Sequence, residues 1–412
     1  MEAIATKHTP KILLFLAQPH GTLVGDGPGK FKTLDDLCKW AHDECGYEGV
    51  TAPAGLPFVD IDLVLNSKHY ADDTLYHYEK LGTPLRRLEM HTIGQRMYLH
   101  PAEVPRFKMF TTESLWTASF RKHERAAAAE ALLVIEASAM LGFQTLPTFS
   151  GNRGWTAAQY PWSAYPDKWR LHILLLAILK HRVALARCAE LGIKYGFELH
   201  PNEDLNSPLL LYLFRELAKV VAPEIVPAIS ANADASHPTI AGDEAGKHFD
   251  FLYEQNLLGM CHLKDGELGD VFLNPETPEF RGGSIRGDFA PRYSESNRRF
   301  CTFGTGDSDW NDIIPILRAA EVDFVVEGEC SKFPNMKQAL KIAAENARLA
   351  RDGKPLVNKY DLVPEPADGD NWEQFCTSKV PATELLCMEA DEIRAVEEMR
   401  EKLPAELLER YF

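Results

Sequence analysis

The stretch "RCAELGIKYGFELHP", residues 187–201, joins the end of a helix to a short apolar strand through a leucine and a glycine. Glycine adopts the left-handed backbone conformation that ends many helices at little energetic cost. The apolar run that follows has the usual strand length of about five residues, and it ends in Glu198 and His200. The stretch therefore predicts a helix-to-strand unit whose strand ends in groups able to bind a metal ion or a substrate.

The same unit recurs along the chain. A helix-like segment that stops at glycine precedes a short apolar run in four further places, at residues 41–53, 77–92, 137–149 and 254–266. All apolar runs of this kind predict eight strands, at residues 11–17, 49–52, 87–93, 143–148, 195–200, 226–234, 259–265 and 323–329. Helices are predicted at residues 126–141, 167–191, 206–221, 308–320 and 335–350. The third of these is expected to begin with Ser207 as its N-cap and Pro208 as its first residue.

Strands that alternate with helices run parallel and are joined by crossover helices. Eight such units favour an α/β fold of the (β/α)₈ TIM-barrel type. The alternative is an open, doubly wound sheet, but no G-x-G-x-x-G loop opens a helix after the first strand. The stretch "GDGPGK" at residues 25–30 has glycines without that spacing, so we interpret it as a loop.

The expected domain organisation is a catalytic barrel over residues 1–353 followed by a helical C-terminal extension over residues 354–412. A long connection from Gly266 to Phe303 follows the seventh predicted strand and is rich in Gly, Pro, Arg and Asp. Connections of this length are usually functional or disordered. The extension is expected to wrap the barrel or to contact a second subunit of a homo-oligomer, although a solvated charged helix without a partner is an equal alternative.

Composition restricts the classes of partner. The chain has 412 residues, of which 45% are hydrophobic, and a formal net charge of −16. An acidic chain repels phosphate backbones, so we expect no nucleic-acid ligand. No run of 18 apolar residues occurs, so no membrane span is expected. The eight cysteines are scattered without a C-x-x-C pair, which is typical of a reduced, cytoplasmic protein.

The strand ends carry the chemistry, because the active sites of TIM barrels lie at the C-terminal ends of the strands. Predicted strands five to eight end in the pairs Glu198 and His200, Asp234 and His237, His262 and Lys264, and Glu327 and Glu329. Taken singly, such residues can be helix caps, turn residues, ion-pair partners or core histidines. Taken together, they would bury several carboxylates in one small space, which is costly unless a divalent cation compensates their charge.

Two glutamates, one aspartate and one histidine form a ligand set of three oxygens and one nitrogen. Such a set suits Mn²⁺ first, with Mg²⁺, Co²⁺ or Zn²⁺ as alternatives. The motifs that carry these residues are "FELHP", "NADASHP", "CHLKDGE" and "FGTGDSDWNDIIPILRAAEVDFVVEGE". They resemble the xylose-isomerase-like family of sugar isomerases and epimerases. The resemblance implies a TIM barrel with one catalytic divalent metal, held by Glu198, Asp234, His262 and Glu327, and it implies that His237 contacts the substrate.

The sequence also departs from the pattern of the ketose 3-epimerases in that family. Those enzymes carry an arginine shortly after the H-x-K-D histidine, whereas "CHLKDGELGD" offers none. Arg281 or Arg286 in the long connection could substitute. Together with the long connection, this departure leaves room for relatives that act on larger keto-sugars, such as inosose dehydratases and C-glycoside deglycosidases.

The resulting hypothesis is a metal-dependent sugar isomerase or epimerase. Glu198 and Glu327 would move a proton next to a carbonyl through an enediolate. The main alternative is a lyase that performs β-elimination on a keto-sugar or keto-glycoside. A metal phosphodiesterase of the endonuclease type is disfavoured by the net charge, and a non-enzymatic scaffold is disfavoured because all four ligands are present.

Other residues are expected near the mouth of the barrel. His91 follows the third predicted strand, and Arg153 and Trp155 lie in the "SGNRGW" loop after the fourth. Together with His200 and Lys264, His91 and Trp155 are candidate substrate-binding residues. Loop packing is an equal alternative for His91, Arg153 and Trp155, and for Lys264 the alternative is a solvated charge at the end of a strand.

Overall fold

The structure is a computed structural model, and it describes residues 9–20, 31–111, 113–116, 118–154, 167–201, 203–268, 298–328, 335–358, 360 and 394. Eight parallel strands in this part of the chain form one sheet in the order β3-β2-β1-β10-β7-β6-β5-β4. They are β1 (Ile12–Phe15), β2 (Gly49–Pro53), β3 (Leu85–Glu89), β4 (Thr145–Thr148), β5 (Lys194–Glu198), β6 (Ile229–Asp234), β7 (Leu258–Leu263) and β10 (Phe324–Val326).

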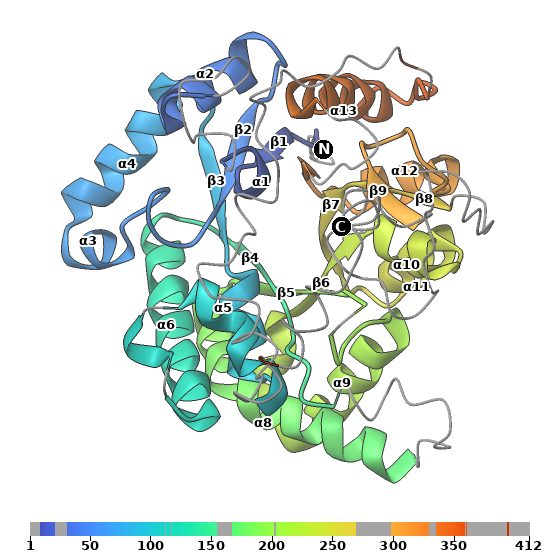
Figure 1. The fold of residues 1–412 in the computed structure, drawn as a ribbon. Helices are drawn as coiled ribbons and strands as arrows, with labels where there is room; N and C mark the ends of the chain where they lie inside the picture. The colour runs from blue at the N-terminus through green and yellow to red at the C-terminus, as the bar shows by residue number, and fades with distance from the viewer. Residues whose placement is uncertain are drawn as a thin grey trace, which may run out of the picture.

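The sheet closes into a barrel between its two end strands, β3 and β4. The backbone N–H of Met90, directly after β3, donates to the carbonyl of Pro147 in β4 over 2.9 Å. Helices surround the strands (Figure 1). The eight strands, the alternation with helices and the (β/α)₈ TIM-barrel prediction are confirmed.

The α-helices of the described residues are α1 (Ala17–His20), α2 (Leu34–Asp43), α3 (Ile61–Asn66), α4 (Lys68–Lys80), α5 (His91–Met97), α6 (Phe120–Met140), α8 (Asp167–Leu191), α9 (Pro208–Val221), α10 (Ser236–Ala241), α11 (Ala245–Glu254), α12 (Trp310–Ala319) and α13 (Met336–Arg351). The described residues also form the 3₁₀ segments η2 (Pro101–Phe110), η3 (Glu113–Leu115) and η4 (Pro223–Ala228). None of these helices combines the length and apolarity that a membrane span needs.

The predicted strands differ at their ends from those observed, most clearly the third and the sixth. The third was predicted to run to Ile93, but β3 ends at Glu89 and α5 begins at His91. The sixth was predicted to begin at Val226, but β6 begins at Ile229. The preceding residues form η4, whose prolines Pro223 and Pro227 cannot donate hydrogen bonds to a neighbouring strand.

The helix-ending glycines are confirmed in most units. Gly82, Gly142 and Gly192 have positive φ angles of 78°, 78° and 70°, as expected for the left-handed end of a helix. The unit at residues 254–266 is different, because Asn256 takes the positive φ of 54° and Gly259 lies inside β7. A Cβ at Gly259 would overlap the hydroxyl of Ser230, so this glycine permits close approach of β6 and β7.

The predicted start of α9 is also confirmed. The hydroxyl of Ser207 accepts a hydrogen bond from the N–H of Leu210, and Pro208 is the first helical residue. This N-cap satisfies a backbone donor that has no partner within the helix.

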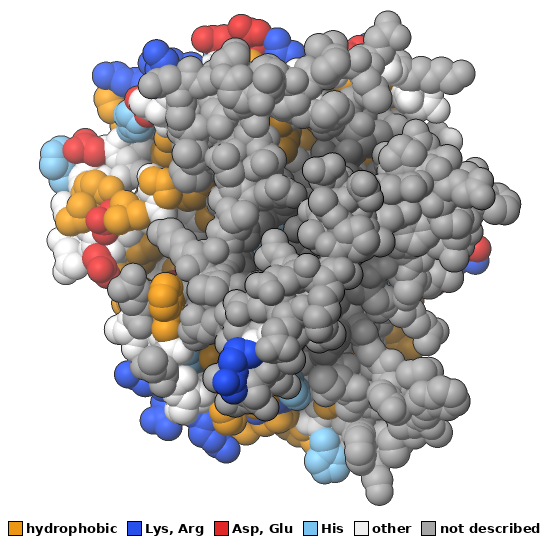
Figure 2. All heavy atoms as spheres, viewed as in Figure 1, with side chains coloured by type: hydrophobic (Ala, Val, Ile, Leu, Met, Phe, Trp, Pro, Cys, Tyr) orange, Lys and Arg blue, Asp and Glu red, His pale blue; other side chains and the backbone are white. Residues whose placement is uncertain are grey.

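The long connection after β7 begins and ends in a two-stranded antiparallel hairpin, β8 (Asp265–Leu268) and β9 (Arg298–Cys301). Residues 269–297, which include Arg281 and Arg286, lie outside the described part. Of the C-terminal extension, residues 354–358, 360 and 394 are described, so its helical nature and any contact with a second subunit stay predictions. Figure 2 shows basic, acidic and apolar side chains together on the described margin of one face of the molecule.

Candidate metal centre

The four predicted metal ligands meet at the C-terminal ends of neighbouring strands. Glu198 ends β5, Asp234 ends β6, His262 lies in β7 and Glu327 directly follows β10, and these strands are adjacent in the sheet. One ligand atom from each residue lies within 4.8 Å of the others. Ligand atoms about 2.1 Å from a shared cation are at most ~4.2 Å apart. The cluster therefore needs little adjustment to hold one ion.

The convergence follows from the register of the strands. Asp234 pairs directly with His262 across β6 and β7, and His262 pairs with Val325 of β10. Glu327 lies two residues beyond Val325, so its side chain is on the same face as that of Val325. Parallel pairing thus aligns polar strand ends that are far apart in the sequence.

The distances within the cluster are short. Nδ1 of His262 lies 3.2 Å from Oε2 of Glu198 and 3.4 Å from Oε2 of Glu327. Nδ1 of His262, Oδ2 of Asp234 and Oε2 of Glu327 are buried and make no hydrogen bond of ordinary geometry in the described protein. The ammonium group of Lys264 is the cation nearest to the two carboxylate oxygens among the described residues. The convergence of hard oxygen donors and an imidazole nitrogen on one point fits a divalent cation.

The remaining oxygens of the carboxylates are held by neighbouring side chains. Oε1 of Glu198 lies 3.0 Å from Nε2 of His237, and Oε1 of Glu327 accepts a hydrogen bond from the Gln18 amide over 2.7 Å. Asn232 donates to Oε2 of Glu198 over 2.8 Å. The two glutamates are therefore fixed in orientation before any ligand binds.

Asp234 has a separate anchor. Its Oδ1 accepts hydrogen bonds from the backbone N–H and the hydroxyl of Ser236, over 2.8 and 2.6 Å. This turn geometry is the structural role that the sequence alone also allows for an aspartate at this position. Because Oδ2 faces the cluster, Asp234 fulfils the turn role with one oxygen and faces the ion site with the other.

Lys264 is part of the cluster and is 1% exposed. Its Nζ lies 2.8 Å from Oε2 of Glu327 and 3.2 Å from Oδ2 of Asp234, and it lies 4.3 Å from the centre of the Phe300 ring. It is therefore not a solvated charge at the end of a strand.

The charges of the cluster shift the pKa values of its members. Burial alone would raise the pKa of Glu198, but His262 and His91 hold it well below its usual range. Burial would also raise the pKa of Glu327, and Lys264 and His262 lower it overall. For His262, the effect of burial is outweighed by Glu89, Glu198 and Glu327, and its pKa is raised well above the usual value. The carboxylates thus stay ionised in a buried site.

Glu89 is a member of the site that the sequence analysis missed. It ends β3, is 2% exposed and places Oε2 at 3.1 Å from Nε2 of His262. Burial would raise its pKa, but Arg87 and His262 lower the pKa to about 2. Glu89 would have been predicted as a site residue if the third predicted strand had been taken to end at this residue, because functional groups are expected at the strand ends.

Histidines and phenylalanines line the space around the cluster. His91 places Nε2 at 2.9 Å from Oε2 of Glu198, and its ring lies 4.8 Å from that of Phe149. The ring of His200 lies 4.4 Å from that of His237. Phe15 stacks on His262 at 5.5 Å between ring centres. The structure therefore brings His91, His200, His237 and Lys264 to the predicted mouth.

The remaining predicted residues are not among the described members of the cluster. Trp155 and Glu329 lie outside the described residues. Arg153 donates to the carbonyl of Leu99 over 2.7 Å and pairs with Glu124, which supports loop packing. Asp265, which follows Lys264, accepts hydrogen bonds from the indole of Trp310 and from backbone N–H groups of residues 266, 306 and 308, so it anchors the segment before α12.

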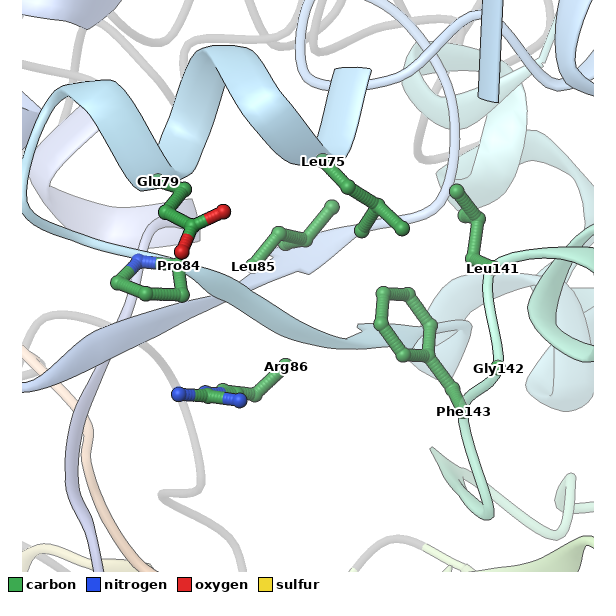
Figure 3. Close-up of a pocket in the computed structure, with 8 residues that line it drawn as sticks. All are labelled: Leu75, Glu79, Pro84, Leu85, Arg86, Leu141, Gly142 and Phe143. Atoms are coloured by element: carbon green, nitrogen blue, oxygen red, sulfur yellow. The ribbon is translucent and has the colours of Figure 1, made fainter. Parts of the chain in front are cut away.

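A cavity of about 320 Å³ lies away from this cluster (Figure 3). It is lined by residues of α4, the start of β3 and the segment after α6, namely Leu75, Glu79, Pro84, Leu85, Arg86, Leu141, Gly142 and Phe143. Leu85 begins β3 and Glu89 ends it. The cavity is therefore at the opposite end of the strand from the ligand cluster.

Comparisons with known proteins agree with this architecture. A family model described as "Xylose isomerase-like TIM barrel" matches residues 41–352. A search of curated proteins gave no match. Among solved structures, a xylose isomerase domain protein from Planctomyces limnophilus matches with a TM-score of 0.50 and 14% identity, over 84% of this chain and 98% of that chain. At this identity the likeness shows the fold alone.

Two other matches are weaker. One is a probable 3-DHS dehydratase from Bacillus anthracis, with a TM-score of 0.49 and 14% identity over 81% of this chain and 97% of that chain. The other is a D-psicose 3-epimerase from Clostridium cellulolyticum H10, with a TM-score of 0.47 and 12% identity over 83% of this chain and 99% of that chain.

Proposed function

The chain belongs to the xylose isomerase-like TIM-barrel family, and from that premise we propose that it is a divalent-metal-dependent sugar isomerase or epimerase. The observation that carries the proposal is the convergence of buried ligand atoms from Glu198, Asp234, His262 and Glu327 on one point. Mn²⁺ is the proposed ion, and Mg²⁺, Co²⁺ or Zn²⁺ would also suit these ligands.

Charge balance supports a divalent cation. The buried carboxylates Glu89, Glu198, Asp234 and Glu327 carry four negative charges, and Arg87 and Lys264 carry two positive charges. One dication would neutralise the remaining two negative charges. Without it, even a protonated His262, whose pKa is raised by the surrounding carboxylates, would leave one negative charge uncompensated in the buried site.

The ion, when bound, would polarise the substrate carbonyl and stabilise the negative charge that develops on its oxygen. Glu198 and Glu327 would move the proton. Each has one oxygen, Oε2, near Nδ1 of His262 and a second oxygen on another partner. The second oxygen can take a proton from the carbon next to the carbonyl or return one to it.

The other residues would bind and orient the substrate. His237 and His91 each present a ring nitrogen next to Glu198, so either could hydrogen-bond a substrate oxygen. Phe15 and Phe149 lie beside the histidine rings and would help to keep water away from the enediolate. Return of the proton to the same carbon from the opposite face gives epimerisation, and its delivery to the former carbonyl carbon gives isomerisation.

Elimination is a second candidate reaction, and Lys264 is the observation that favours it. The ammonium group lies 2.8 Å from Glu327 and is buried, which gives the site a proton donor besides the two glutamates. Loss of a hydroxyl or glycosyl group from the β position needs such a donor for the leaving group. The same site could then act as a lyase on a keto-sugar.

Deuterium exchange tests the proposal and separates the two reactions. The full chain, loaded with Mn²⁺, is incubated in D₂O with a panel of ketoses, inososes and 3-keto-glycosides, and the products are analysed by NMR spectroscopy after the Mn²⁺ is removed. Deuterium at a carbon next to the carbonyl, with the carbon skeleton intact, is expected for an isomerase or epimerase. An unsaturated product, or one lacking its leaving group, would indicate the lyase.

A chelator-treated sample is the control and should show neither outcome. A metal-loaded sample that neither exchanges deuterium into any member of the panel nor forms an elimination product would contradict both proposed reactions. Incision of a DNA duplex containing an abasic site by the same sample would favour the phosphodiesterase alternative instead.

A further inference from the structure

Glu89 contacts a metal ligand without belonging to the four-ligand cluster. Its Oε2 lies 3.1 Å from Nε2 of His262, and both side chains are fully buried. Nε2 is the ring nitrogen opposite Nδ1, and it is Nδ1 that faces Glu198 and Glu327. The stacked ring of Phe15 covers one face of the imidazole. The ring is thus held on its face and at the nitrogen that points away from the cluster.

We propose that Glu89 is the positioning residue of the metal centre. It accepts the N–H of His262 Nε2 and thereby keeps Nδ1 directed at the ion. This inference rests on the proposed function, because it assigns a role to Glu89 in the same site. A carboxylate that accepts from the outer nitrogen of a metal-binding histidine fixes the tautomer and raises the basicity of the ligand.

Arg87 fixes the orientation of Glu89 in turn. The two residues lie two apart on β3, so their side chains are on the same face of the strand. Nε of Arg87 donates to Oε1 of Glu89 over 3.1 Å, and Arg87 is itself 4% exposed. Each oxygen of Glu89 therefore has its own partner, Arg87 on one side and His262 on the other.

A second cation is the rival explanation, since Glu89, His91 and His262 also bring ligand atoms within 4.8 Å of one another. Such a cation would require Nε2 of His262 to lose its proton and would lie close to the positive charge of Arg87. Even after the loss of that proton, the buried site would carry one excess positive charge, because a single dication already neutralises it. Uncompensated buried charge is costly, so hydrogen bonding is the better account of Glu89.

The test measures the binding of Mn²⁺ to the full chain. Binding is monitored through the electron paramagnetic resonance signal of the free ion. One Mn²⁺ per wild-type chain is expected. Glu89→Gln should weaken the affinity by ~10–100-fold, the usual effect of removing such a partner of a metal ligand. Glutamine keeps the shape of the side chain, but it has no charge and brings an NH₂ group toward either Arg87 or His262.

Two further variants distinguish positioning from a general loss of structure. Glu124→Gln is the matched control, because Glu124 is also buried and pairs with an arginine and a lysine, Arg153 and Lys180. Its Mn²⁺ affinity should stay within about twofold of the wild type. Glu89→Asp keeps the charge and should recover part of the lost affinity. Circular dichroism confirms that each variant is folded.

The inference is overturned if Glu89→Gln binds Mn²⁺ as tightly as the wild type. It is also overturned if the wild type binds two Mn²⁺ and the variant one, since Glu89 would then be a ligand of a second ion. A wild type that binds no Mn²⁺ contradicts both the inference and the proposed metal centre. One that binds Mn²⁺ but exchanges no deuterium contradicts the proposed reaction alone.

Discussion

Two groups of buried carboxylates in this barrel have opposite electrostatic behaviour. In the ligand cluster, the pKa values of Glu198 and Glu327 are lowered although both groups are buried. In the turn after β5, burial raises the pKa of Glu203 to about 8 and that of Asp204 to about 7. Both groups are next to the same strand, so depth in the protein does not explain the difference.

The difference in pKa between the two groups follows from the hydrogen-bond and charge partners of their carboxyl groups. Glu203 accepts hydrogen bonds from neutral donors, namely the Gln95 amide over 2.6 Å and the backbone N–H of Gly151. Asp204 accepts from the backbone N–H of Gly154 over 2.7 Å. These bonds fasten residues 150–154 to the turn after β5. Burial raises the pKa of a carboxyl group unless nearby positive charges compensate, and such charges converge in the ligand cluster.

The largest effect is expected from a substitution in the ligand cluster. Glu327→Gln removes both a ligand and a proton carrier, so the rate of deuterium exchange should fall by ~10²–10⁴-fold or more. Glu203→Gln changes an equally buried carboxyl outside the cluster and should leave the rate close to that of the wild type. The rates are measured at saturating Mn²⁺ with the best substrate of the panel. Equal rates for both variants would show that the ligand cluster is not the catalytic site.

The next effect concerns the turn after β5 and the dependence of stability on pH. The pKa of Glu203 is about 8 in the folded protein and 4.5 in its ordinary state. Between these values the folded chain binds more protons than the unfolded chain, so the free energy of unfolding falls as the pH rises. The contribution of Glu203 is a few kcal/mol across this range.

Glu203→Gln should therefore make the free energy of unfolding less dependent on pH between about 4.5 and 8, as urea titrations at several pH values can show. The difference between variant and wild type isolates Glu203 from His262, whose raised pKa acts in the same direction. Parallel pH profiles of variant and wild type would mean that Glu203 is ionised in the folded protein, and the contrast between the two groups would be lost.

A smaller effect is expected from the metal itself. Mn²⁺ at about 100 times its dissociation constant should stabilise the wild type by ~2.7 kcal/mol, because the ion binds the folded chain and not the unfolded one. Asp234→Asn should lose most of this gain, whereas Glu203→Gln should retain it. The measurement is the urea midpoint with Mn²⁺ and after chelation. A wild-type midpoint that Mn²⁺ does not change would contradict a structured ion site.

The smallest effect is expected from a substitution outside both groups of carboxylates. This variant serves as a reference for the other variants. Ser207→Ala removes the N-cap of α9 and should lower the free energy of unfolding by ~1 kcal/mol. Ser207 contacts neither group of carboxylates in the described structure, so Mn²⁺ affinity should not change. A change in Mn²⁺ affinity in this variant would mean that general destabilisation also weakens the site, and the other variants would need correction for it.

The sequence was sufficient for the barrel and for the grouping of four polar residues at the strand ends. Alternation of helix and strand fixes the parallel arrangement, and parallel pairing places the strand ends at one mouth. Glu198, Asp234, His262 and Glu327 could therefore be grouped before any distance was known. Their separation could not be predicted, because it depends on the register between β6, β7 and β10.

Other parts of the site depended on contacts that local sequence does not reveal. Glu89 was missed because "RLEMHTI" was read as one strand, although β3 ends at Glu89 and a helix begins two residues later. The buried position of Lys264 within the cluster was not predicted, because lysines at strand ends are usually solvated. Asp265 anchors residues about 40 positions further along the chain, a partnership that only the folded structure shows.

The junction between β3 and β4 has a consequence for the whole barrel. The hydrogen bond from Met90 to Pro147 is the backbone link between these strands in the described residues, whereas β4 and β5 are joined along a full ladder. Helix α5 packs so closely here that a Cβ at Gly94 would overlap Thr148. An opening of the cylinder at this junction would free the edge of β3, the strand that ends in Glu89. Because Glu89 contacts His262, closure of the cylinder and retention of the proposed ion would then depend on the same strand.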